Sequence, residues 1–100
     1  PDALAATHRA RPLKAICVQP FLHNPLGASM SGARRAEIAA FLVAEDLPAI
    51  EDAIYAFLVD DAPLAALAPD HVVLVDSLSK RVAPGLTLGF IAAPQRWVPD

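Results

Sequence analysis

Four short apolar runs divide the chain, and each is followed by a polar or turn-forming stretch. They cover residues 13–18, 47–50, 72–75 and 88–92. Runs of this length, bounded by proline, glycine and charged residues, are typical of buried strands in an α/β sheet. The segments between the first three runs predict right-handed crossovers that join parallel strands. The last run follows a loop without a helical pattern, so we expect it to be antiparallel to its predecessor.

A helix is predicted between the first two strands. Ile38, Phe41 and Leu42 recur at helical spacing, while charged side chains occupy the other faces. The hydroxyl of either Ser29 or Ser31 is suited to cap the first turn of this helix. The pattern therefore predicts an amphipathic helix that packs one apolar face against the sheet.

Shorter helical patterns lie on either side of this unit. Residues 1–8 have the composition of a helix end, and residues 64–67 predict a single turn within the alanine- and proline-rich connector 60–69. Together with the strands, they predict an α/β fold with a four-stranded mixed sheet and flanking helices. Three strands are expected to be parallel, with the last one antiparallel.

Polar side chains gather where each of the three parallel strands ends. The clusters are Asn24 after the first strand, Asp52 and Tyr55 after the second, and Ser77, Ser79 and Lys80 after the third. Parallel strands place their carboxyl ends along one edge of the sheet, where open α/β folds bind ligands. We therefore expect the three clusters to converge on one crevice.

Each cluster also has an ordinary structural explanation. Asn24 precedes a proline and suits a simple turn, Asp52 can end a strand, and Lys80 can be a solvated loop residue. Tyr55 can be a core aromatic with its hydroxyl at the rim. The functional alternative is an anion site beside an amine, because a lysine near apolar walls can act as a Schiff-base nucleophile.

The segment SLSKRVAPGLTLG resembles the cofactor-lysine segment of fold-type I enzymes dependent on pyridoxal 5'-phosphate, the aspartate aminotransferase superfamily. The resemblance implies that Lys80 forms the Schiff base with the cofactor, and that Ser77 and Ser79 lie near its phosphate. One position departs from the family pattern. Where the family has a phosphate-binding arginine after Pro-Gly, this sequence has Thr87.

Two further motifs agree with this resemblance in order, and together they extend it over residues 13–94. Asn24 matches the asparagine of Asn-Pro-x-Gly, which implies a hydrogen bond to the phenolic oxygen of the cofactor. Asp52 and Tyr55 match an Asp-x-x-Tyr pair. The resemblance places the aspartate at the pyridine nitrogen and the tyrosine hydroxyl at the phenolic oxygen.

Within the superfamily, the chain most resembles the aminotransferase-like domain of GntR/MocR-type transcriptional regulators. The pieces that carry this likeness are Ser29-Met30-Ser31 with Arg34-Arg35, Glu51-Asp52, and Leu67-Ala68-Pro69. The likeness implies a cytoplasmic homodimer that senses the cofactor or an amino compound, and DNA contact only through a domain outside this chain. Two alternatives stay open: part of a free-standing amino-acid aminotransferase, and a non-catalytic α/β interaction module.

Residues 1–100 as a whole are interpreted as a central, cofactor-binding part of the large domain of such a protein. The sequence begins at Pro1 and stops soon after Trp97, which we interpret as cuts in a larger chain. The stacking aromatic, the glycine-rich phosphate loop and the substrate-binding arginine of the family have no counterpart here. We therefore expect these residues alone to lack transaminase activity.

Composition narrows the classes of function further. The sequence is 55% hydrophobic with a formal net charge of −3 and no basic run, so it offers no electrostatic surface for nucleic acid. No apolar run is long enough to predict a membrane span. The single cysteine, Cys17, lies in an apolar run and cannot form an internal disulfide, so we expect a buried thiol in a reducing compartment.

The segment that follows Ser79 is expected to be extended. Because side chains alternate in direction along an extended segment, we expect Arg81 to point away from Lys80.

Overall fold

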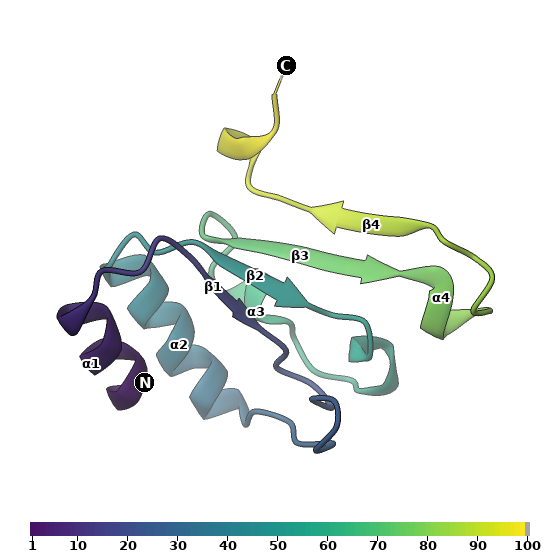
Figure 1. The fold of residues 1–100 in the computed structure, drawn as a ribbon, viewed down its shortest axis with the longest axis horizontal. Helices are drawn as coiled ribbons and strands as arrows, with labels where there is room; N and C mark the ends of the chain where they lie inside the picture. The colour runs from purple at the N-terminus through teal and green to yellow at the C-terminus, as the bar shows by residue number, and fades with distance from the viewer. Residues whose placement is uncertain (100) are drawn as a thin grey trace.

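The computed structural model describes residues 1–99, and its centre is a single four-stranded sheet (Figure 1). The strands, β1 to β4 in spatial as in chain order, are Ile16–Val18, Ala49–Asp52, Val72–Ser77 and Gly89–Ala92. β1, β2 and β3 are parallel, and β4 is antiparallel to β3. The predicted α/β class and mixed sheet are confirmed.

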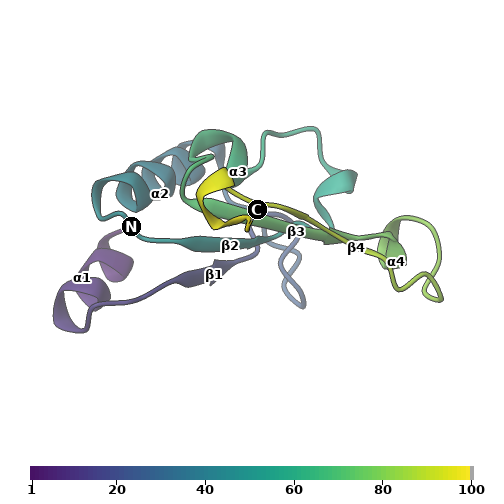
Figure 2. The same ribbon diagram turned by 90° about the horizontal axis from the view of Figure 1, so that it is seen from above.

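Two helices cover one face of this sheet. They are α2, Gly32–Ala44, and the single turn α3, Leu64–Leu67, which lie on the same side in Figure 2. The connections from β1 to β2 and from β2 to β3 step in the same direction across the sheet. Because crossovers between parallel strands are right-handed, both place their helices on the same face. The core between these layers consists of Ile38, Ala39, Leu42, Leu47, Ala49, Leu64, Ala68 and Val72.

Helix α2 is capped as the sequence predicts, and the structure selects one of the two candidate serines. The hydroxyl of Ser31 accepts a hydrogen bond from the backbone N–H of Arg34 at 3.2 Å. Ser29 instead accepts from the backbone N–H of Leu22, within the preceding turn. A third helix, α1 at Asp2–Ala10, packs beside the end of α2 through an edge-to-face contact of His8 with Phe41.

The second strand begins later than predicted. The backbone N–H of Leu47 closes the end of α2 by donating to the carbonyl of Leu42. Pro48 has no N–H to give to a sheet ladder, although its carbonyl accepts from Ile16. The strand therefore starts at Ala49, and its later residues, Glu51 and Asp52, belong to the sheet.

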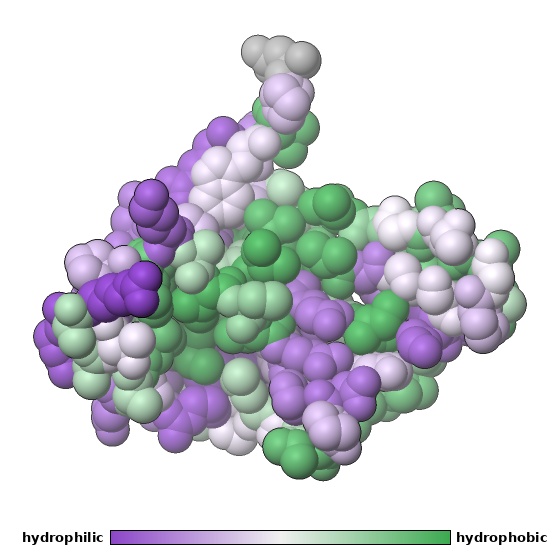
Figure 3. All heavy atoms as spheres, viewed as in Figure 1, coloured by the Kyte–Doolittle hydropathy of each residue, from purple (hydrophilic) through white to green (hydrophobic). Residues whose placement is uncertain are grey.

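The other face of the sheet exposes apolar side chains, and the prediction of a buried Cys17 is wrong. Cys17 is level with Ile50 in β2 and Val73 in β3, on the face opposite the helices. Its thiol is exposed, and Ile50 is 44% exposed. Figure 3 shows apolar side chains gathered over the strands on this side. The pattern of apolar residues identified the strand, but not which of its faces is covered.

Two adjacent arginines at the start of α2 have different environments. Arg34 is exposed and pairs with Glu37 at 3.2 Å. Arg35 is buried: it donates to the carbonyl of Met30 at 2.6 Å, pairs with Asp61 at 3.0 Å, and lies 4.7 Å over the ring of Phe21. It therefore joins the helix to the turn before it and to the connector after β2.

We expect Arg35→Gln to lower the free energy of unfolding by about 2 kcal/mol, because it removes a buried guanidinium that contacts the Met30 carbonyl, Asp61 and the ring of Phe21. Arg34→Gln should cost less than about 0.5 kcal/mol, since its ion pair is exposed. Denaturant midpoints of the two variants compare them directly. Equal losses would contradict the structural role of Arg35.

Candidate functional site

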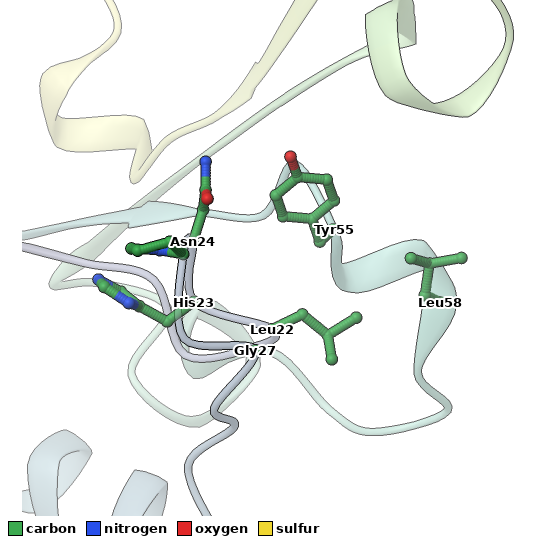
Figure 4. A pocket seen from close by; sticks show the side chains of 7 residues that line it. Leu22, His23, Asn24, Gly27, Tyr55 and Leu58 are labelled. Carbon is green, nitrogen blue, oxygen red and sulfur yellow. The ribbon is translucent and has the colours of Figure 1, made fainter.

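Asn24 and Tyr55 come from different strand ends and line the same cavity. This cavity has a volume of about 260 Å³, and Figure 4 shows the amide and the hydroxyl on the same side of it. The remaining lining residues are Leu22, His23, Pro25, Gly27 and Leu58. Of the first two clusters, the structure therefore brings Asn24 and Tyr55 to one cavity, while Asp52 does not line it.

The turn after β1 holds the backbone of Asn24 and leaves its amide available. The backbone N–H of Asn24 donates to Oε1 of Gln19 at 3.1 Å. His23 and Ala28 form an antiparallel bridge across the turn, and Gly27 closes it with a φ of 65° that glycine adopts readily. The peptide bond from Asn24 to Pro25 is cis. The amide of Asn24 is thus presented to the cavity by a closely hydrogen-bonded loop.

Tyr55 is placed by the turn that follows β2. It directly precedes η1, the 3-10 helix Ala56–Leu58, whose first N–H donates to the carbonyl of Ala53 at 2.9 Å. The tyrosine is half-buried, with its hydroxyl directed toward the same opening as Asn24 (Figure 4). Both side chains bring a hydrogen-bond donor to the same side of the cavity, an arrangement that suits an oxygen anion.

Asp52 lies at the end of β2, between the Asn24 turn and the end of β3. It lines one cavity of about 420 Å³ that includes Cys17 and His23, and a second of about 370 Å³ that includes Ser77. Its Oδ1 accepts from the backbone N–H of Ile54 at 3.0 Å. Among the residues that the structure describes, Oδ2 has no hydrogen-bond partner, so one acceptor is free at the cavity edge.

Lys80 lies on α4, a single helical turn at Leu78–Arg81 that directly continues β3. The sequence predicted an extended loop here, and that prediction is wrong. Ser77 caps the turn by accepting from the backbone N–H of Ser79. The lysine side chain is exposed and lines none of the three cavities described above. It shares the sheet edge with the other clusters but not their cavities.

The hydroxyl of Ser79 is already used within the protein. It donates to the carbonyl of Leu86 at 2.8 Å and so holds the loop between α4 and β4. Ser77 accepts from Ser79 but keeps its own hydroxyl proton for another partner. Thr87, next to Leu86, is exposed. Of these three hydroxyls, Ser77 and Thr87 are therefore the ones that remain available.

Two buried acidic residues with structural roles escaped the sequence analysis. Glu51 is fully buried and accepts from the backbone N–H groups of Leu64 and Ala65, at the start of α3. Asp76 is buried and pairs with Arg81. The sequence did contain a signal for both acids. Each is a charged residue within an apolar strand, at a position that the alternation of side chains assigns to the helix-covered face, which indicates a buried charge.

Two classes of site are not found in the described part of the chain. Residues 1–99 contain no group of three or more histidine, cysteine, aspartate or glutamate side chains that is placed to hold a metal ion. Over the same residues, every helix is too short or too polar to cross a bilayer.

Comparison with known proteins supports the same interpretation. The family described as aminotransferase class I and II matches residues 2–99. An uncharacterised HTH-type transcriptional regulator of Bacillus subtilis, YdfD, is 37% identical over 100 residues, which cover 95% of this chain and 21% of YdfD. This chain thus spans about a fifth of that relative.

Solved aminotransferase structures have the same fold. An archaeal alanine:glyoxylate aminotransferase superposes with a TM-score of 0.79 at 30% identity, over 92% of this chain and 24% of that protein. LysN, the α-aminoadipate aminotransferase of Thermus thermophilus, in complex with N-(5'-phosphopyridoxyl)-L-leucine, superposes with a TM-score of 0.83 at 25% identity, over 95% and 26% of the two chains.

Proposed function

This chain belongs to the aminotransferase class I and II family, and we propose that it forms the pyridoxal 5'-phosphate-binding core of an aminotransferase-like domain in a GntR/MocR-type transcriptional regulator. The observation that carries the proposal is the shared cavity of Asn24 and Tyr55. Asp52 and Lys80 lie at the ends of the next strands of the same sheet edge. The order of these groups is the one that the family motif implies.

The polar groups at this edge suit the ring of the proposed cofactor. When bound, pyridoxal 5'-phosphate supplies an electron-accepting ring that stabilises negative charge at the α-carbon of an amino compound. The amide of Asn24 and the hydroxyl of Tyr55 would donate hydrogen bonds to its phenolic oxygen. The free Oδ2 of Asp52 would accept from the ring nitrogen and keep it protonated.

Lys80 would have two roles in this site. Its amine would bind the cofactor covalently and, once released by an incoming amino compound, would accept and return a proton as general base and acid. The exposure of Lys80 agrees with the first role, because the amine is accessible to an aldehyde. Ser77 offers the phosphate a free hydroxyl donor, while Ser79 would have to give up its bond to Leu86 to do so.

The regulator is favoured over a free-standing aminotransferase by the names of the relatives. YdfD and a second B. subtilis protein, YdeF, are both HTH-type transcriptional regulators, at 37% and 36% identity. We propose accordingly a cytoplasmic homodimer whose effector is a small amino compound, with DNA bound by a part of the protein outside these residues. Turnover of an amino acid with a keto acid by the intact protein would favour the aminotransferase instead.

Covalent labelling tests the proposal, because the sequence contains only two lysines, Lys14 and Lys80. The intact protein that carries this sequence is mixed with pyridoxal 5'-phosphate, reduced with borohydride and digested for mass spectrometry. We expect a yellow adduct that loses its colour on reduction, and then a mass increase on Lys80 but not on the exposed Lys14. Lys14→Ala should keep the signal and Lys80→Ala should lose it. Equal labelling of both lysines would favour the non-catalytic interaction module.

A further inference from the structure

A partly buried ion pair lies beside the turn that carries Lys80. Nε of Arg81 donates to Oδ2 of Asp76 at 3.0 Å, and Nη2 of Arg81 contacts the same oxygen. The Asp76 side chain is 9% exposed and that of Arg81 is 38% exposed. The guanidinium also stacks over Phe57 of η1, 5.0 Å from the ring centroid. Three elements meet at this contact: β3, α4 and the turn after Tyr55.

The single turn α4 needs such a contact to hold its orientation. It spans only Leu78–Arg81, and one i to i+4 bond, from Val82 to Leu78, closes it. Helices this short are unstable without tertiary contacts, because nucleation costs more than one hydrogen bond returns. Asp76 is level with Phe90 of β4, and it lies on the opposite face of β3 from Ser77. Its bond to Arg81 therefore fixes which way the turn faces.

Fixing Arg81 also fixes its neighbour. Successive side chains of a helix point about 100° apart, so the direction of Lys80 follows from the direction of Arg81. The contact of Arg81 with Phe57 further ties this turn to the segment that begins at Tyr55, whose hydroxyl faces the Asn24 cavity. We propose that Asp76 and Arg81, braced by Phe57, are positioning residues: they hold the turn α4 and thereby fix the direction of the Lys80 amine at the sheet edge.

The proposal rests on the proposed function of Lys80 and is tested by the rate at which Lys80 attaches to pyridoxal 5'-phosphate. Attachment joins the lysine nitrogen to the aldehyde carbon and releases one water. In the intact protein, we expect Arg81→Gln and Asp76→Asn to slow it by about tenfold or more, since small misplacements of reacting groups have large effects on rate. Phe57→Leu, which leaves the ion pair in place, should slow it by a few fold.

A second aldehyde separates orientation from general damage to the fold. Reductive methylation with formaldehyde measures the intrinsic reactivity of Lys80, which needs no orientation toward a cavity. We expect that rate to stay within about twofold in every variant, at temperatures below each melting point. The charge-reversed pair Asp76→Arg with Arg81→Asp should recover part of the cofactor rate. Arg34→Gln, which breaks an exposed ion pair of α2, is the matched control and should change neither rate.

Each outcome decides one question. If the wild type acquires no label on Lys80, the proposed function fails, and the positioning role fails with it. If the wild type is labelled but Arg81→Gln reacts at the wild-type cofactor rate, only the positioning role is overturned. If both aldehydes slow equally, the ion pair acts on the reactivity or stability of the turn, and the role in orientation is overturned. Arg81 is partly exposed, so its variants decide the matter even if Asp76→Asn fails to fold.

Discussion

Replacing Glu51 by alanine is expected to lower the free energy of unfolding by about 4 kcal/mol, because this buried carboxylate holds the start of α3. Its two oxygens accept from the backbone N–H groups of Leu64 at 3.0 Å and Ala65 at 2.8 Å. Hydrogen bonds to a charged group contribute about 1.5–3 kcal/mol each. The alanine variant would leave both donors without this acceptor and open a space beside Leu64, which is fully buried.

Two further variants separate charge from shape in this contact. Glu51→Gln keeps the volume and one acceptor oxygen, so we expect about half the loss of the alanine variant. Glu37→Ala removes an exposed carboxylate of α2 and should cost less than about 0.5 kcal/mol. Hydrogen exchange of the amides of Leu64 and Ala65 reports on the contact locally, alongside denaturant midpoints. Unchanged protection of these two amides in Glu51→Ala would contradict the capping role.

Local pattern was sufficient to predict the sheet and the connector turn. The predicted turn at residues 64–67 is helix α3 as observed, and the first three strands are parallel with the last antiparallel, as expected. Apolar runs and the rules for crossovers depend on short-range chemistry, which a sequence displays directly. The role of Glu51 was not predicted, because its partners, Leu64 and Ala65, are 13 and 14 residues away.

The candidate site, like the fold, was predicted from the sequence only in part. The convergence of Asn24 and Tyr55 followed from parallel strands that end at one edge. The helical turn at Lys80 was missed because four residues carry too little periodicity to predict a helix. The turn is joined to the sheet by the pair of Arg81 with Asp76, a charged residue in an apolar strand. Such a residue indicates a buried contact but does not identify the partner.

Thr87→Arg is expected to tighten binding of pyridoxal 5'-phosphate by about tenfold to a hundredfold, equivalent to about 1.5–3 kcal/mol. The position matches the phosphate-binding arginine of the family pattern, and a neutral hydroxyl cannot replace a charged, forked donor. The nearest cation in the sequence besides Lys80 is Arg81. Its guanidinium is bound to Asp76 and stacked on Phe57, so it is not free to take over.

Comparing pyridoxal 5'-phosphate with pyridoxal isolates the phosphate contribution. The intact protein and its Thr87→Arg variant are titrated with both compounds, and only the phosphorylated one should bind more tightly to the variant. Val82→Arg adds the same charge at an exposed position of the same loop and should have a small effect on both. If Thr87→Arg binds the phosphate ester no better than wild type does, another group already holds the phosphate. A selective gain would instead mean that the natural threonine weakens retention, which suits a sensor that releases its ligand better than an enzyme that keeps its cofactor bound.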